Sequence, residues 1–215
     1  MLSNIKTISL QGLDGIVITV EVDITEGMPG WEIVGLPDTS IRESRERIKS
    51  AIKNSGIDFL NRKYIVNLSP ADIRKEGSIL DLPIAVGVLA SIGVLKEDAY
   101  NDTIFIGELA LDGSLRKVNG VLPICVEALK HNFKKIIVPI ENAKEAAVVE
   151  NLEVYGISNL MQLVNFLNRK INLPKTGVNI EQFFKNNAKL SLDFSEVAGQ
   201  ESVKRALEVA AARGS

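Results

Sequence analysis

One segment, Asp81 to Gly93 (DLPIAVGVLASIG), is charged only at its first residue, and it limits the folds open to this chain. Its apolar residues are too numerous for an amphipathic helix with one solvent-exposed face, so we expect a helix buried on most of its surface. The apolar run, IAVGVLASIGVL, is well short of the roughly 20 residues that crossing a bilayer requires. The segment therefore predicts the centre of a globular core, with main apolar side chains Ile84, Ala85, Val88, Leu89 and Ile92.

Asp81 opens this helix, and two interpretations of it are open. An Asp at a helix start can accept hydrogen bonds from the free amides of the first turn. Pro83 is tolerated in that turn because those amides have no partner within the helix. We expect Asp81 to cap the helix; the alternative is that it belongs to a catalytic site.

The order of predicted elements favours an α+β fold. Two strand-like segments, 6–10 and 16–24, flank an Asp-Gly turn signal and predict a hairpin. A helix is expected from Asp38 or Ser40, the candidate caps, to just before Gly56. Strand-like segments at 31–36, 63–70 and 103–111 and a later alternation of helices and strands complete a compact part that ends at about Asn168. Early hairpins with later alternation favour α+β over a purely parallel sheet.

We expect three parts along the chain. Residues 1–168 form the compact domain. Residues 169–191 lose clear periodicity and predict a linker, and residues 192–215 begin a new unit.

Composition excludes several classes of protein. The net charge of −2 provides no overall basic field that would draw the chain to nucleic acid, although a local basic patch remains open. The single cysteine, Cys125, excludes an internal disulfide, and with the single histidine, His131, it cannot complete a four-ligand zinc site. We expect Cys125 to be a buried structural thiol and no metal site. The first residues lack the pattern of a signal peptide, so we expect a cytoplasmic protein without membrane contact.

The helix at 38–55 is rich in cations. Arg42 and Arg45 belong to this set, which Glu43 and Glu46 partly offset. A solvated amphipathic helix is the simpler interpretation, and a helix that faces nucleic acid is the alternative.

Several long motifs together carry a resemblance to a known family. They are GMPGWEIVGLPDTSIRESRERIKSAI, YIVNLSPADIRKEG, KEGSILDLPIAVGVL, IGELALDGSLRKVNGVLP and KIIVPIENAKEA. They resemble the N-terminal domain of the YifB/ComM family of magnesium-chelatase-like AAA+ ATPases. That domain is in turn similar to the proteolytic domain of Lon, whose α+β fold is shared with domain 2 of a ribosomal small-subunit protein. The resemblance therefore implies a Lon-protease-like fold for residues 1–168.

The resemblance to Lon also implies where a catalytic dyad would lie. Asp81 stands where the Lon serine would be, and Leu122, within a residue or so, stands where the lysine would be. An aspartate has no hydroxyl to activate and a leucine takes no proton, so we expect no catalytic residues and no protease activity. A displaced dyad of Ser78 and Lys117 is the alternative. Glu108 could act as a base, but we expect it to anchor a turn or pair with Arg116 or Lys117.

The last residues resemble the opening of an AAA+ module. In such modules the loop before the first helix contacts adenine, which implies partial nucleotide contacts at Val197, Gly199 and Gln200. The phosphate-binding motif G-x-x-x-x-G-K-[ST] should follow, and the sequence reaches Ser215 without it. We therefore expect no cofactor in this chain, and ATP with Mg²⁺ in the full-length parent, which the resemblance implies is a homo-oligomeric ring, expected to be a hexamer.

The resemblance implies a non-catalytic accessory domain of an ATPase that acts on DNA, with a branch-migration or helicase-like role in transformation and recombination. Contacts to DNA or to a partner are expected at Arg42, Arg45, Arg74 and Lys75. The chain's own AAA+ module is a further expected partner. The alternative is an oligomerisation or partner-docking domain without DNA contact.

Overall fold

The structure is a computed structural model that describes residues 2–12 and 14–178. The chain divides into two units, Met1–Val178 and Asn179–Ser215, and the second lies outside the described residues. The predicted AAA+ start at 192–215, most of the predicted linker, and Val197, Gly199 and Gln200 therefore lie outside them too.

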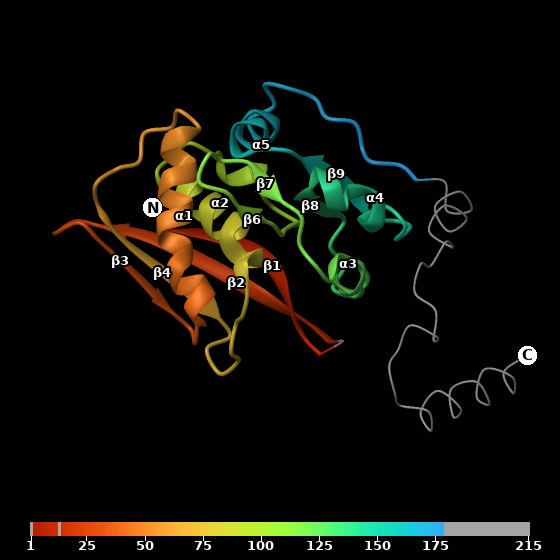
Figure 1. Cartoon of the computed structure of the whole chain (residues 1–215), viewed down its shortest axis with the longest axis horizontal. Helices are drawn as coiled ribbons and strands as arrows, with labels where there is room; N and C mark the ends of the chain where they lie inside the picture. The colour runs from red at the N-terminus through yellow and green to blue at the C-terminus, as the bar shows by residue number, and fades with distance from the viewer. Residues whose placement is uncertain (1, 13, 179–215) are drawn as a thin grey trace, which may run out of the picture. The chain divides into compact units, whose positions relative to one another are not determined.

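A seven-stranded mixed sheet forms the frame of the first unit (Figure 1). Its strand order is β3-β4-β2-β1-β5-β8-β9. Strands β1 and β2 form the predicted hairpin, β4 pairs antiparallel with β2, and the remaining neighbours pair in parallel. The strands are β1 (Ser3–Gln11), β2 (Asp14–Thr25), β3 (Gly30–Val34), β4 (Lys63–Ser69), β5 (Thr103–Phe105), β8 (Lys135–Pro139) and β9 (Glu153–Ile157). The α+β prediction is confirmed in this coarse sense.

Helices cover both faces of the sheet. They are α1 (Thr39–Asn54), α2 (Asp81–Ser91), α3 (Val121–Lys130), α4 (Ala143–Ala146) and α5 (Leu160–Leu167). Side chains of a strand alternate between faces, so Ile5 of β1 joins the core under α1, α2 and α5, whereas Ile8 joins the core under α3 and α4. The unit is therefore layered, with one hydrophobic core on each side of the sheet.

Helix α2 is the buried centre that the apolar run predicts, because every one of its residues is buried. It packs against β1 and β2 and contacts α1, and Figure 1 shows the two helices side by side. Gly87 explains the close approach to the sheet: a Cβ there would lie 2.6 Å from Cγ2 of Val22. Glycine within a helix usually lowers stability, but at this position no larger residue fits.

Short elements connect these layers. The 3₁₀ helices are η1 (Ser78–Leu80), η2 (Glu97–Ala99) and η3 (Ile140–Asn142). A second, two-stranded sheet pairs β6 (Glu108–Leu109) with β7 (Leu115–Arg116) and brings its residues to the start of α2.

The segment after α5 belongs to the folded unit, which corrects the predicted boundary at Asn168. The Thr176 amide donates to the Val154 carbonyl of β9 at 2.8 Å, and the Lys175 ammonium bonds to the Glu153 carboxylate. Because these contacts extend along the edge strand, the compact unit reaches Val178. Among the described residues, no helix is long and apolar enough to span a membrane.

Candidate functional site

The start of α2 is the centre of the candidate site, and the capping prediction for Asp81 is wrong. Asp81 is the first residue of α2, Leu80 occupies the N-cap, and no side chain caps the helix. The carboxylate of Asp81 is instead directed sideways, toward α1. An aspartate one position inside the helix still complements the positive end of the helix dipole.

Arg47 of α1 is the partner of Asp81. Its Nε donates to Oδ2 at 2.7 Å and its Nη2 to Oδ1 at 2.9 Å. The Leu109 amide of β6 donates to Oδ2 at 3.2 Å, and Arg47 Nη2 also donates to the Ser40 carbonyl at 3.0 Å. The two parallel bonds are the bidentate geometry that a guanidinium makes with a carboxylate. This pair ties α1, α2 and β6 together.

The pair is placed where water has little access. The side chain of Asp81 is 1% exposed and that of Arg47 is 22% exposed. Burial raises the pKa of the Asp81 carboxyl above its ordinary value, because leaving water penalises the charged form, while the bonds from Arg47 oppose that shift. The hydrogen bond to Asp81 raises the pKa of Arg47. A carboxylate engaged in this way accepts hydrogen bonds and has no hydroxyl to activate.

Ser78 and Lys117, the alternative dyad, line one pocket of about 290 Å³ next to this pair. Ser78 Oγ donates to Glu108 Oε2, and Arg116 Nη1 approaches Glu108 Oε1 at 3.4 Å. The expectation that Glu108 pairs with Arg116 is therefore confirmed. The serine hydroxyl is directed at a carboxylate, and the structure records no hydrogen bond between Ser78 and Lys117 within the described part of the chain.

Leu122, the second position that the Lon resemblance singles out, lies on α3 and is 41% exposed. Its hydrocarbon side chain can neither donate nor accept a proton. Among residues 2–12 and 14–178, no group of three or more His, Cys, Asp or Glu residues could hold a metal ion. Cys125 is buried, as expected.

The predicted cationic contacts divide into exposed and buried residues. Arg42 is exposed, Arg45 is exposed beside Glu46 (3.4 Å), and Arg74 is exposed beside Glu76 (3.1 Å). Lys75 is fully buried and its ammonium donates to the Pro70 carbonyl, so the prediction that Lys75 contacts DNA or a partner is wrong. Its backbone holds the segment in place, because its amide donates to the Leu36 carbonyl at 3.1 Å.

Sequence reasoning missed Arg47. It lies among the other cations of α1 in sequence, and its partner is 34 residues away. The signal that could have identified it is its helical spacing: Arg47 is one residue before Ile48 and three after Ser44, both of which are buried.

Comparison with known proteins adds the family. The family described as subunit ChlI of Mg-chelatase matches residues 20–142, more than half of the chain. The chain belongs to this magnesium-chelatase-like family. The match includes Arg47 and Asp81, so the magnesium-chelatase-like assignment covers the candidate site itself.

Two curated relatives match nearly the whole chain. Competence protein ComM of Haemophilus influenzae is 38% identical over 202 residues, which are 94% of this chain and 40% of ComM. YifB of Escherichia coli is 38% identical over 215 residues, which are 99% of this chain and 41% of YifB. The chain thus spans about two fifths of these relatives, and the predicted YifB/ComM membership within the AAA+ magnesium-chelatase-like family is confirmed. A weaker match, 22% identical over 168 residues, is Lon protease 2 of Bacillus subtilis, covering 70% of this chain and 30% of that protein.

Proposed function

We propose that this unit is a non-catalytic accessory domain of an AAA+ ATPase that acts on DNA, and that it positions DNA or neighbouring subunits. The observation that carries the proposal is the Asp81–Arg47 pair. It occupies the helix start where the Lon resemblance would require a serine, and it uses the carboxylate to join α1 to α2. A residue committed to holding two helices together fits a binding domain and not a hydrolase.

The fold we propose is that of the Lon proteolytic domain without its dyad. The similarity to Lon protease 2 over 168 residues supports it, as does the mixed sheet with a wholly buried helix after a 3₁₀ turn. The parent of this chain is proposed to bind ATP and Mg²⁺ and to assemble as a homo-oligomeric ring, with a cytoplasmic location. ComM is named a competence protein, which supports a branch-migration or helicase-like role on DNA in transformation or recombination.

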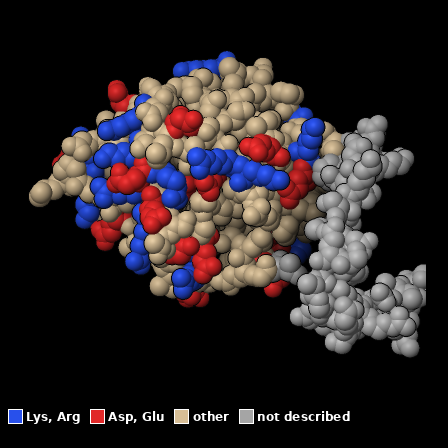
Figure 2. Space-filling model, in the orientation of Figure 1, with Lys and Arg blue, Asp and Glu red and all other residues tan. Residues whose placement is uncertain are grey.

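We propose that three exposed cations contact DNA, namely Arg42, Arg45 and Arg74. They would bind the phosphate backbone and would not distinguish one base sequence from another. Figure 2 shows Lys and Arg gathered over α1 and the neighbouring part of the molecule, interleaved with Asp and Glu. Phosphate contacts of this kind orient a protein on DNA without reading bases.

The test is binding of the chain to a labelled branched DNA at two salt concentrations. Binding that weakens steeply with salt is expected, because each phosphate contact releases counterions. Replacing Arg42, Arg45 or Arg74 by Ala should weaken binding and reduce the salt dependence, whereas Lys134→Ala, which removes an exposed cation after α3, is the matched control. Absence of binding at low salt would contradict the DNA contact.

A second candidate function is oligomerisation or partner docking, which one observation favours. Leu122 and Val126 lie one turn apart on α3 and are 41% and 43% exposed, so that helix presents apolar side chains to its surroundings. A mass that rises with protein concentration, and that Leu122→Ser abolishes, would support this candidate.

A further inference from the structure

A small pocket of about 50 Å³ lies between α1, β3 and the segment before β4, away from the α2 site. Three aromatic side chains, Trp31, Phe59 and Tyr64, and three cations, Arg45, Lys49 and Arg62, contribute to its wall. We call it the Trp31 pocket. Its residues come from three separate segments of the chain, so folding alone brings them together.

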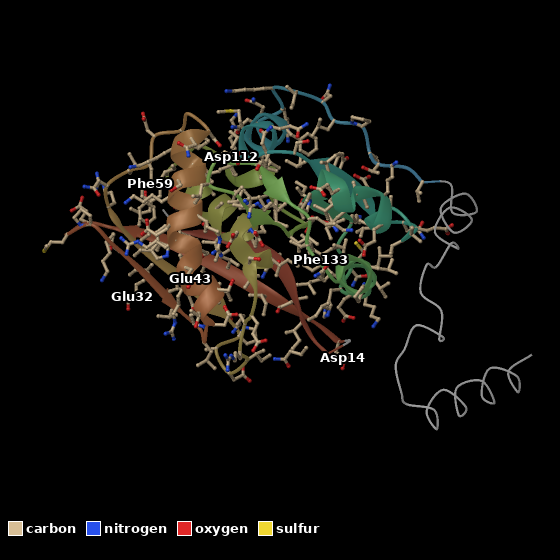
Figure 3. All side chains as sticks on the ribbon, viewed as in Figure 1. Asp14, Glu32, Glu43, Phe59, Asp112 and Phe133 are labelled. Atoms are coloured by element: carbon tan, nitrogen blue, oxygen red, sulfur yellow. The ribbon has the colours of Figure 1, made fainter. Side chains whose placement is uncertain are left out.

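The aromatic side chains give the pocket a firm wall. The ring centroids of Trp31 and Tyr64 are 5.4 Å apart, and those of Phe59 and Tyr64 are 4.9 Å apart. Tyr64 is 1% exposed, and its hydroxyl donates to the Leu60 carbonyl at 2.8 Å. Figure 3 shows Phe59 beside α1. Packed rings of this kind stabilise one another beyond the apolar area that they bury.

The indole of Trp31 provides a donor that nothing in the described chain satisfies. Its Nε1 atom is buried and has no hydrogen-bond partner among residues 2–12 and 14–178. A buried polar group without a partner costs about 1–3 kcal/mol. An indole N–H can only donate, so only an acceptor that reaches Nε1 could satisfy it.

The cations that line the pocket favour a negatively charged acceptor. Arg45 and Lys49 are one turn apart on α1 and therefore share a face, and Arg62, from the segment before β4, also lines the pocket. Arg45 has a partner in Glu46 at 3.4 Å, but both side chains are largely exposed and such pairs are weak. The nearby Glu32 is engaged by Lys63 at 3.4 Å. Lys49 and Arg62 form no ion pair with any described residue, so positive charge prevails at the pocket.

We propose that the Trp31 pocket binds a phosphate group of a nucleic-acid strand, with Arg45, Lys49 and Arg62 as its cationic donors. The pocket has room for a small oxyanion and not for a base, so it would hold the backbone without reading sequence. Arginine and lysine are the side chains suited to phosphate. This inference rests on the proposed function and names the surface through which the domain meets DNA.

Trp31 is the single tryptophan of the chain, so its fluorescence reports on the pocket. Because Nε1 is shielded from solvent, binding includes a small shift of the side chains around it, and that shift should change the emission. We would titrate the chain with single-stranded oligothymidylate and, separately, with inorganic phosphate at low salt. Oligothymidylate is expected to change the emission in a salt-dependent manner.

Variants distinguish binding at this pocket from a general attraction between surface cations and the strand. Lys49→Ala and Arg62→Ala should each weaken binding to oligothymidylate and reduce its salt slope by about 1. Lys134→Ala, which removes an exposed cation outside the pocket, should leave both unchanged. Trp31→Phe, followed with a labelled strand, removes the N–H donor while keeping an aromatic ring and should also weaken binding. Urea unfolding of each variant verifies that it is folded.

The outcomes distinguish the inference from the proposed function. Strand binding without an emission change, equally tight in Arg62→Ala, would overturn the pocket and leave the proposed DNA contact standing. Absence of strand binding at low salt would overturn the DNA contact. An Arg62-dependent response to inorganic phosphate would then reassign the pocket to a free phosphate and overturn its assignment to nucleic acid, and no response to either probe would overturn the pocket entirely.

Discussion

The Arg47 guanidinium meets the Asp81 carboxylate through two parallel hydrogen bonds of 2.7 and 2.9 Å, joining the middle of α1 to the first residue of α2. The Leu109 amide adds a third bond at 3.2 Å. A side chain that opens the most buried helix of the unit is thus fixed by a neighbouring helix and a neighbouring strand. The stability of the start of α2 should depend on it.

Asp81→Ala is expected to lower the free energy of unfolding by about 3 kcal/mol, because it leaves a largely buried guanidinium without its counter-ion. Glu46→Ala, which breaks the exposed pair with Arg45, should cost less than about 1 kcal/mol. Urea unfolding followed by circular dichroism measures both. A double-mutant cycle with Arg47→Ala should show strong coupling; equal costs for Asp81→Ala and Glu46→Ala would contradict a structural role for the pair.

The chain is expected not to cleave unfolded proteins. The Ser78 hydroxyl donates to the Glu108 carboxylate, and a carboxylate is a far weaker base than a neutral lysine amine. Incubation with labelled casein, followed by release of soluble label, tests this. Cleavage that disappears in both Ser78→Ala and Lys117→Ala would show that the displaced dyad works and would refute the non-catalytic interpretation.

Local structure was predictable from the sequence because its signals are local. Asp38 caps α1 by accepting from the Ile41 amide at 2.8 Å, and the predicted hairpin forms, although Asp14 and Gly15 of the turn signal already belong to β2 and pair with Gln11 and Leu10. The site was less predictable because its partners are distant in sequence. Arg47 resembles its solvated neighbours on α1, and Lys75 is of a type that is rarely buried. Only the tertiary fold shows that Arg47 pairs with Asp81 and that Lys75 is buried.

Asn142, the last residue of η3, is bonded to Val118 in the segment before α3, and the stability of the unit should depend on this contact. Its Oδ1 accepts from the Val118 amide and its Nδ2 donates to the Val118 carbonyl, both at 2.9 Å and both buried. Asn142→Asp removes the donor and brings a carboxylate against that carbonyl, so it should cost about 2 kcal/mol or more at neutral pH.

The loss in Asn142→Asp should shrink at acidic pH, because a protonated carboxyl can donate to the Val118 carbonyl again. Asn132→Asp, at an exposed position after α3, is the control and should change stability little. Thermal unfolding at two pH values measures both variants. A cost for Asn142→Asp that does not depend on pH would contradict the role given to the donor.

Cys125 should react slowly with thiol reagents in the folded protein. Burial raises the pKa of its thiol to about 12, with a smaller contribution from the charge of Glu145. Only the thiolate is nucleophilic, so at a mildly alkaline pH the folded chain holds about 1 thiolate in 10,000, far fewer than an unfolded chain with an ordinary thiol. Because the folded thiol keeps its proton where the unfolded one loses it, stability should also fall as pH rises above about 9.

A disulfide reagent added with and without urea measures the reactivity of the Cys125 thiol. Because Cys125 is the single cysteine, the signal needs no assignment. Equal rates in both conditions would show that α3 opens readily and that the core beneath it is not closed.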